Sequence, residues 1–222
     1  MHDLFHISPV WHDPAPGLKR ASLLLGFVLA LESAGMAVRA QVPVDPLALT
    51  GIMRGVEAAV LLALGPWSMR GEGDPRAALQ GLVLALAVSF AGLAAVGVWT
   101  ILFNAPPPGL FPSRLDPETA WIPFLFTTSL ASPLTEELVF RGILYRGLRE
   151  RWNAIPAMLV VSGIFAGLHV LFGGQALVPL LGSLLFCAGY EVTRHISAPV
   201  LLHVFGNGIL IAAPSLGLFQ AG

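Results

Sequence analysis

The chain has 222 residues, of which 55% are hydrophobic and 11% are charged, and its formal net charge at pH 7 is −1. An ordinary soluble domain carries about 25% charged residues, so this composition excludes a soluble domain with an ordinary surface. The charge balance also excludes the strongly basic surface that binds a nucleic-acid backbone, and we expect no nucleic acid among the partners. We therefore predict an all-α integral membrane protein, built as a polytopic bundle of transmembrane helices.

Seven apolar stretches follow one another along the chain, and each is close to the length of about 20 residues that a helix needs to cross a bilayer. Turns rich in proline and glycine separate several of them, as at residues 42–46 and 104–109. The predicted spans are residues 20–39, 47–68, 78–103, 119–145, 155–172, 175–193 and 197–219. The sequence thus predicts about three spans in an N-terminal region, residues 1–118, and four in residues 119–222.

The distribution of Lys and Arg between the predicted loops gives the orientation of the bundle, because cytoplasmic loops of membrane proteins are enriched in these residues. With a cytoplasmic N-terminus and seven crossings, eight basic residues lie on the cytoplasmic side and two on the other. The eight are Lys19, Arg20, Arg70, Arg76, Arg146, Arg149, Arg151 and Arg194, and the two are Arg39 and Arg114. We predict a cytoplasmic N-terminus and, from the compact chain rich in Ala, Leu and Gly, a bacterial inner membrane.

The fourth predicted span, residues 119–145, contains a proline and several charged residues. Pro133 removes one backbone hydrogen bond and is expected to kink the helix. Thr135 is then placed to cap a new helical stretch. The residues after it mix apolar and charged side chains, which predicts an amphipathic helix that leaves the membrane core near the cytoplasmic face.

Two adjacent carboxylates, Glu136 and Glu137, precede Arg141 in this segment. A charge near the centre of a membrane helix costs on the order of 3 kcal/mol by insertion scales, so such groups persist when they are paired, hydrated or used. Residues four apart share a helix face, whereas adjacent residues are rotated by about 100°. We therefore predict that Glu137 and Arg141 neutralise each other, and that Glu136 faces the interior of the bundle.

Two further pairs with the same spacing of four residues follow on later spans. Phe165 precedes His169, and His203 precedes Asn207. Counted from the arginines at the cytoplasmic ends of their helices, Glu136 and His203 lie at similar depths, about 15 and 14 Å. The side chains of these segments are therefore expected to meet inside the bundle.

A glutamate, two histidines and an asparagine at one depth suit hydrolysis. In a partly apolar cavity, Glu136 can act as general base on water, and a histidine can orient that water. A His–Asn pair can donate hydrogen bonds to an oxyanion. Alternatively, Glu136, His169 and His203 are a ligand set for zinc, with a fourth position open for water. The His-Glu-x-x-His signature of helical zinc proteases does not occur.

The three motifs together resemble those of the CAAX-processing and bacteriocin-processing enzyme family, intramembrane proteases related to the type II prenyl-protein endopeptidases. The family pattern is Glu-Glu-x-x-x-Arg, then Phe-x-x-x-His, then His-x-x-x-Asn on successive hydrophobic helices. Residues 136–141, 165–169 and 203–207 carry these motifs in that order. The resemblance implies a helical catalytic domain in residues 119–222, with the motifs within 119–212, whereas residues 1–118 match no family that we can name.

The resemblance also implies a role for each motif residue. Glu136 would activate a water molecule that His169 holds, and His203 and Asn207 would stabilise the oxyanion. Three further residues would support them: Glu137, Arg141 and Phe165. The family is described both as metal-dependent and as glutamate-dependent. We favour the metal-free glutamate mechanism without a cofactor, because asparagine is a poor zinc ligand and a good donor, and we keep zinc as the alternative.

The predicted function is an intramembrane endopeptidase that cleaves a membrane-associated peptide or protein. An ion or proton transporter is an alternative, because intramembrane Glu, His and Arg also build proton relays. Against it, the polar residues concentrate in residues 136–207, and no internal repeat is visible. A non-catalytic immunity or scaffold protein, which would use the same fold to bind a partner, is a further alternative.

Helical spacing predicts two more ion pairs, Arg54 with Glu57 in the second span and Glu191 with Arg194 at the end of the sixth. Small residues let membrane helices approach closely. On this ground close packing is predicted at the glycines of the last three spans, such as Gly163, Gly167 and Gly206.

Overall fold

The computed structural model describes residues 18–65, 75–105 and 121–215, and every regular element within these residues is a helix. Six elements are continuous α-helices: α1 (Leu18–Gln41), α2 (Pro46–Leu64), α3 (Pro75–Phe103), α7 (Ala154–Leu171), α8 (Leu177–Thr193) and α9 (Ser197–Ser215). Between α3 and α7 lies one composite rod, built of α4 (Trp121–Phe126), η2 (Thr127–Ala131), α5 (Ser132–Glu137), η3 (Leu138–Tyr145) and α6 (Arg146–Arg149). The predicted all-α bundle is confirmed.

Four of the helices are long and apolar enough to cross a membrane, namely Lys19–Gln41, Pro46–Leu64, Pro75–Phe103 and Ala154–Leu171. Large apolar side chains stay exposed on the outer surface, as on α3, where Phe90 is 77% exposed and Ile101 is 83% exposed. Exposed apolar surface of this kind suits contact with lipid. The chain is therefore an integral membrane protein. The apolar helical segments Leu177–Thr193 of α8 and Ser197–Ile211 of α9 are shorter, so the number of seven crossings stays a prediction.

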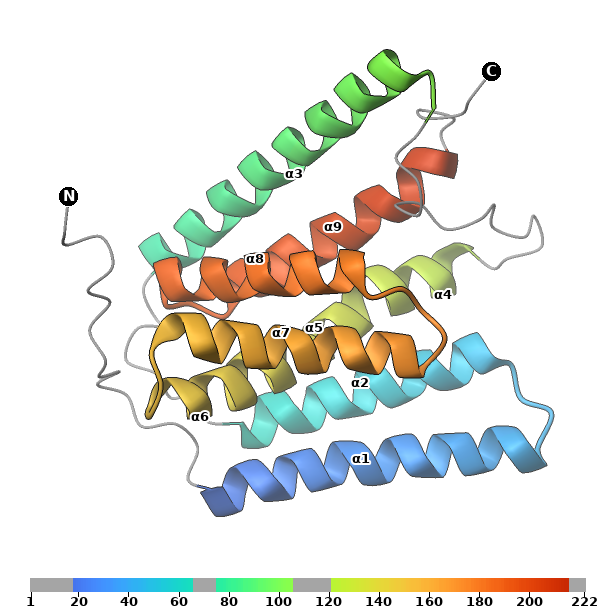
Figure 1. The fold of residues 1–222 in the computed structure, drawn as a ribbon. Coiled ribbons are helices and arrows are strands. Elements are labelled where there is room, and N and C mark those ends of the chain that lie inside the picture. The colour runs from blue at the N-terminus through green and yellow to red at the C-terminus, as the bar shows by residue number, and fades with distance from the viewer. Residues whose placement is uncertain (1–17, 66–74, 106–120, 216–222) are drawn as a thin grey trace.

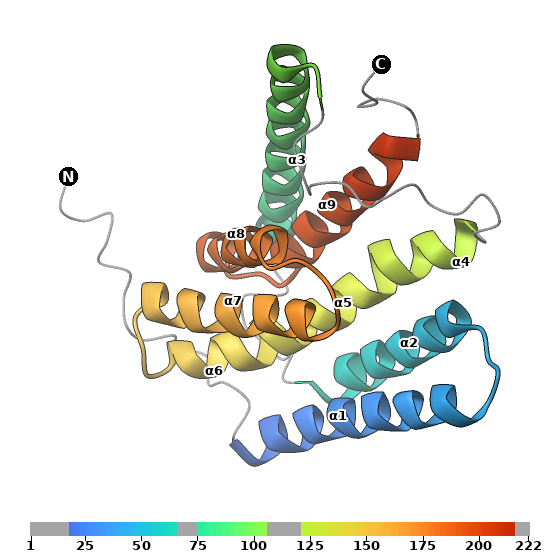
Figure 2. The same ribbon diagram turned by 45° about the vertical axis from the view of Figure 1, so that its right-hand side comes forward.

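Consecutive rods run back and forth across the molecule (Figure 1). The start of α1, the end of α2, the start of α3 and the end of α6 lie toward one side of the bundle. Most of the basic residues expected in the cytoplasm belong to these ends, whereas Arg70 and Arg114 lie outside the described residues. Helices α1 and α2 form one edge and α3 forms the opposite edge, with the remaining helices between them (Figures 1 and 2).

The core is packed around η3, which contacts both α7 and α8. Leu138, Ile143 and Tyr145 of η3 are buried in one cluster with Val161 and Tyr190. The predicted amphipathic helix at the membrane surface is therefore wrong. Residues 138–149 lie within the bundle, and two of their arginines, Arg141 and Arg149, have buried partners on α8.

A buried ionic cluster fastens α6 to α8. Arg149 donates to both carboxylate oxygens of Glu191, at 2.8 and 3.0 Å, and the Tyr145 hydroxyl donates to the same carboxylate at 2.8 Å. Arg194, whose left-handed backbone follows the end of α8, also pairs with Glu191 at 2.9 Å. The predicted Glu191–Arg194 pair is confirmed as one part of this larger cluster.

A second ionic cluster joins α1 to α2 and lies next to the composite rod. Arg54 pairs with Glu57 at 2.5 Å, as predicted, and with Glu32 of α1 at 2.6 Å. The Arg54 carbonyl accepts a hydrogen bond from the hydroxyl of Thr135 at 3.0 Å. Because Thr135 lies inside α5 and bonds to another helix, the prediction that it caps a new helix is wrong.

The backbone stays helical through Pro133, and the turn before this proline, η2, is π-helical. Proline has no N–H, so the carbonyl of Ser129 lacks its usual helical donor. In the preceding turn the Ser132 N–H bonds to the Thr127 carbonyl, five residues back. Such π-helical insertions in α-helices are frequent at functional sites, and here one lies directly before the segment that carries Glu136 and Glu137.

One close helix contact at a glycine is that of Gly81, where the start of α3 meets the backbone of α9. A Cβ atom at this position would lie 3.0 Å from the backbone N and Cα of Ala198. By contrast, a Cβ atom at Gly163, Gly167 or Gly206 would meet nothing within 4 Å among the described residues. The predicted packing role is therefore wrong for these three glycines. It is confirmed for Gly189 of the sixth predicted span, where an added Cβ atom would lie 2.6 Å from Cδ1 of Leu202 on α9.

Candidate active site

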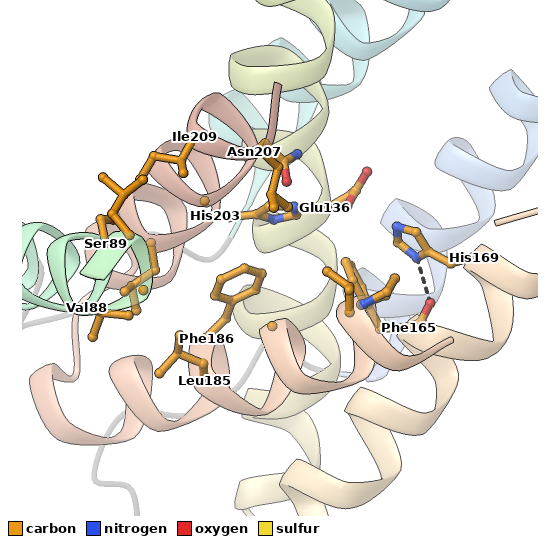
Figure 3. Close-up of a pocket in the computed structure, with 18 of the residues that line it drawn as sticks. Val88, Ser89, Glu136, Phe165, His169, Leu185, Phe186, His203, Asn207 and Ile209 are labelled. Atoms are coloured by element: carbon orange, nitrogen blue, oxygen red, sulfur yellow. Dashed lines mark hydrogen bonds and ion pairs between the residues drawn. The ribbon is translucent and has the colours of Figure 1, made fainter. Parts of the chain in front are cut away.

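A cavity of about 310 Å³ lies within the bundle. Its lining includes side chains from α3, α5, α7, α8 and α9, and among them are Glu136, His169, His203 and Asn207. Figure 3 shows Glu136, His203 and Asn207 gathered together, with His169 on the other side of Glu136 from His203. The structure thus brings the four residues predicted from the sequence to one cavity.

The two adjacent glutamates have different environments. The Glu136 side chain is 23% exposed and lines the cavity, with its Oε2 3.8 Å from Nε2 of His203. The Glu137 side chain is fully buried and pairs with Arg141 at 2.9 Å. The division predicted from helix geometry, with Glu137 neutralised and Glu136 facing inward, is confirmed in the positions of both side chains.

Arg141 is held from several sides although no part of its side chain is exposed. Besides its bond to Glu137, it donates to the backbone carbonyl and the hydroxyl of Ser183 on α8, at 2.9 and 2.6 Å. Its guanidinium carbon also lies 5.2 Å from the ring centres of both Phe165 and Phe186. A buried charge is tolerated when it is paired and hydrogen-bonded in this way.

His203 is oriented by Glu137. Its Nδ1 lies 2.8 Å from Glu137 Oε1, and its ring stacks on Phe186 with the centroids 4.6 Å apart. Because a carboxylate accepts hydrogen bonds, Nδ1 carries the proton, and Nε2 is the nitrogen on the side of Glu136. A neutral His203 therefore presents a lone pair at Nε2, and a protonated His203 presents an N–H there.

His169 is oriented by the backbone of its own helix. Its Nδ1 lies 2.9 Å from the Phe165 carbonyl, and since a carbonyl oxygen only accepts, Nδ1 carries the proton. The other nitrogen, Nε2, is left as an acceptor for water. The centroid of the Phe165 ring lies 4.6 Å from that of His169 and 5.9 Å from that of His203, which it meets edge-on. The supporting role predicted for Phe165 therefore has a physical basis.

Asn207 is anchored to the π-helical turn of the composite rod. Its Nδ2 donates to the carbonyl of Thr128 at 2.9 Å. A carboxamide nitrogen has two hydrogens, so one donor and the amide oxygen remain. Three residues of this site escaped sequence reasoning, namely Thr128, Ser183 and Phe186. Thr128 and Ser183 contribute backbone carbonyls, which no side-chain pattern reveals.

The zinc alternative requires Glu136, His169 and His203 to converge. Among the described residues, no group of three or more His, Cys, Asp and Glu side chains is placed to hold one metal ion. The two histidines nevertheless each secure Nδ1 and leave Nε2 unbonded by protein. This is the orientation in which histidines commonly ligate metals.

Comparisons with known proteins agree with the motifs. Residues 118–209 match the family model described as type II CAAX prenyl endopeptidase Rce1-like. The chain is similar to "Putative membrane peptidase YdiL" of Bacillus subtilis (strain 168), at 29% identity over 87 residues. That similarity covers 39% of this chain and 35% of the relative, so the chain spans about a third of the relative's length. No solved structure matches the chain. The family resemblance inferred from the three motifs is confirmed.

Proposed function

Because residues 118–209 match the family model described as type II CAAX prenyl endopeptidase Rce1-like, we propose that this chain is an intramembrane endopeptidase. Its substrate would be a membrane-associated peptide or protein, and its location the inner membrane of a bacterium. The observation that supports the proposal most is the single cavity lined by Glu136, His169, His203 and Asn207.

In the proposed reaction Glu136 is the general base. It takes a proton from a water molecule, and the water oxygen attacks the carbonyl carbon of the scissile peptide bond. The protonated Glu136 then gives this proton to the leaving nitrogen as the C–N bond breaks. Partial exposure of Glu136 inside a mostly apolar cavity supports this role, because the carboxylate can reach water there.

His169 holds the attacking water in this proposal. Its Nδ1–H is used by the Phe165 carbonyl, so the unprotonated Nε2 can accept a hydrogen bond from the same water that Glu136 deprotonates. The water oxygen is thereby turned toward the carbonyl carbon. Orientation of this kind lowers the barrier by replacing a free encounter with a fixed geometry.

Asn207 and His203 stabilise the oxyanion that forms on the carbonyl oxygen. Asn207 can donate its second amide hydrogen, because the first is used by the Thr128 carbonyl. His203 can donate from Nε2 only when the ring is protonated, since Nδ1 already donates to Glu137. The buried carboxylate of Glu137 holds the His203 ring in this orientation, which assigns Glu137 a supporting role.

A zinc-dependent version of the same protease is the second candidate. It is favoured by the two histidines, which both leave Nε2 unbonded by protein. Zinc would be held by Glu136, His169 and His203, and when bound it would polarise the scissile carbonyl and lower the pKa of bound water. Glu136 would then bind the ion instead of acting alone as the base.

The test uses purified protein in detergent and a peptide library made from bacterial membrane proteins. New termini are identified by mass spectrometry for the wild-type protein and for Glu136→Gln, before and after treatment with a strong chelator. We expect cuts by the wild type that chelation does not stop, and none by the variant. Loss of cleavage on chelation, with recovery on adding zinc, would favour the metal version.

The same variant separates the non-enzymatic alternatives. A scaffold or immunity protein would keep its binding or protective effect in Glu136→Gln, because binding needs no general base. A transporter would move protons into liposomes without producing new peptide termini. Either result, in the absence of wild-type cleavage, would overturn the proposal.

A further inference from the structure

The cavity has two chemically different sides. Glu136, His169, His203 and Asn207 supply its charged and titratable groups. The remaining lining is almost entirely apolar, and on α3 it comprises Val88, Ser89, Gly92, Leu93 and Val96. In Figure 3, Val88 and Ser89 lie on one side of His203, while Glu136 and His169 lie on the other. A peptide whose scissile carbonyl sits at His203 therefore has α3 beside it.

Helix α3 belongs to a part of the chain outside the matched family domain, which begins at residue 118. It is held closely against α9 near its start, where Gly81 meets Ala198. Figure 2 shows α3 and α9 starting close together and separating toward their C-terminal ends. The cavity-lining residues of α3, from Val88 to Val96, lie C-terminal to this contact and form what we call the α3 wall. The contact between Gly81 and Ala198 fixes the position of this wall beside the cavity.

Gly92 is the most open position of this wall. Among the described residues, a Cβ atom added at Gly92 would meet nothing within 4 Å. Space beside a cavity-lining glycine can be occupied by a ligand group, or by a larger side chain introduced by mutation. The same open surroundings occur at Gly97 on the same helix, but Gly97 does not line the cavity.

We propose that the α3 wall around Gly92 is a specificity subsite, which accepts an aliphatic or aromatic side chain of the substrate next to the scissile bond. This inference rests on the proposed function. No charged residue of α3 lines the cavity, so a charged substrate side chain would lose water without gaining a partner. An apolar side chain would instead make van der Waals contact with Val88, Leu93 and Val96.

The experiment determines cleavage profiles with the membrane-protein peptide library. Wild type, Gly92→Leu, Gly97→Leu and Glu136→Gln are compared in the same detergent, after their thermal unfolding has been measured. We expect wild-type cuts to be enriched in Leu, Ile, Val or Phe at one position beside the cut. Gly92→Leu should reduce cleavage at those sites by roughly tenfold and favour Ala, Ser or Gly there, because its side chain fills the subsite.

Gly97→Leu is the matched control, since it adds the same side chain to the same helix outside the cavity. It should keep the wild-type profile. An unchanged profile in Gly92→Leu, or an equal loss at all sites, would overturn the subsite while leaving the protease intact. A wild-type preference for charged residues at that position would also overturn it. Absence of cuts by the wild type, or cuts by Glu136→Gln, would instead overturn the proposed function.

Discussion

The Nδ1–H of His203 donates to Oε1 of Glu137 at 2.8 Å, and this hydrogen bond joins α9 to α5 across 66 positions of the chain. The same carboxylate oxygen accepts from Arg141 at 2.9 Å. One fully buried glutamate therefore connects the third motif to the first. Its neighbour Glu136 lines the cavity instead, so the two adjacent glutamates have different environments.

Replacing the two glutamates should separate stability from activity. Glu137→Gln leaves Arg141 charged and buried without its carboxylate, and breaking such a pair costs about 3–5 kcal/mol. Glu136→Gln changes a partly exposed group and should leave the unfolding temperature in detergent nearly unchanged. Both variants should lose peptide cleavage. Equal unfolding temperatures for the two variants would contradict the assignment of Glu137 to the buried pair.

Replacing His169, which we propose holds the attacking water, should change kcat more than it changes KM. For His169→Ala we expect kcat to fall about 10²- to 10⁴-fold, the range for lost acid–base assistance, with a small change in KM. Phe165→Leu is the comparison, because His169 donates its hydrogen bond to the backbone carbonyl of residue 165, which this substitution keeps. A greater loss of kcat in Phe165→Leu than in His169→Ala would count against this assignment.

Asn207 should stabilise the transition state by donating a hydrogen bond to the oxyanion. Loss of one oxyanion donor costs roughly 10²- to 10³-fold in kcat, and Asn207→Ala should show this loss with little change in KM. Thr128→Ala is the control, since Asn207 bonds to the Thr128 backbone carbonyl and that carbonyl remains. A rise in KM with unchanged kcat for Asn207→Ala would mean that the amide binds the ground state instead.

The Arg149–Glu191 cluster should stabilise the fold without taking part in the reaction, because neither residue lines the cavity. Arg149→Met removes a buried partner of Glu191 and should destabilise the protein by about 3 kcal/mol. Arg151→Met, at an exposed position two residues on, should change stability by less than about 0.5 kcal/mol. Activity per folded molecule should be kept in both, as measured by cleavage normalised to folded protein.

Features that depend on spacing along one helix were predictable from the sequence. The Glu137–Arg141 pair, the inward position of Glu136 and the Arg54–Glu57 pair all follow from the geometry of a helical turn. Contacts between helices were not predictable in the same way. Ser183 on Arg141 and the Thr128 carbonyl on Asn207 join residues 42 and 79 positions apart, and their pairing is fixed only when the bundle packs.

The wrong predictions have a common physical origin. Thr135 has the sequence pattern of a helix start, and Arg141 and Arg149 have that of a surface helix. Each of the three nevertheless bonds to a residue on another helix. Glycine composition likewise does not show which glycines meet a neighbouring helix, as Gly81 and Gly189 do here. The local sequence pattern shows that a segment is helical and which residues share a face. The environment of each residue depends on which neighbouring helix packs against that face.

We propose that Glu136 activates a water molecule whose oxygen enters the product. The most direct measurement is cleavage of membrane-protein peptides in ¹⁸O-labelled water by wild type and Glu136→Gln, purified side by side and shown to unfold at the same temperature. The account predicts ¹⁸O in the new C-terminal carboxylate of wild-type products and no product from the variant. Products formed by Glu136→Gln at the wild-type rate would contradict it.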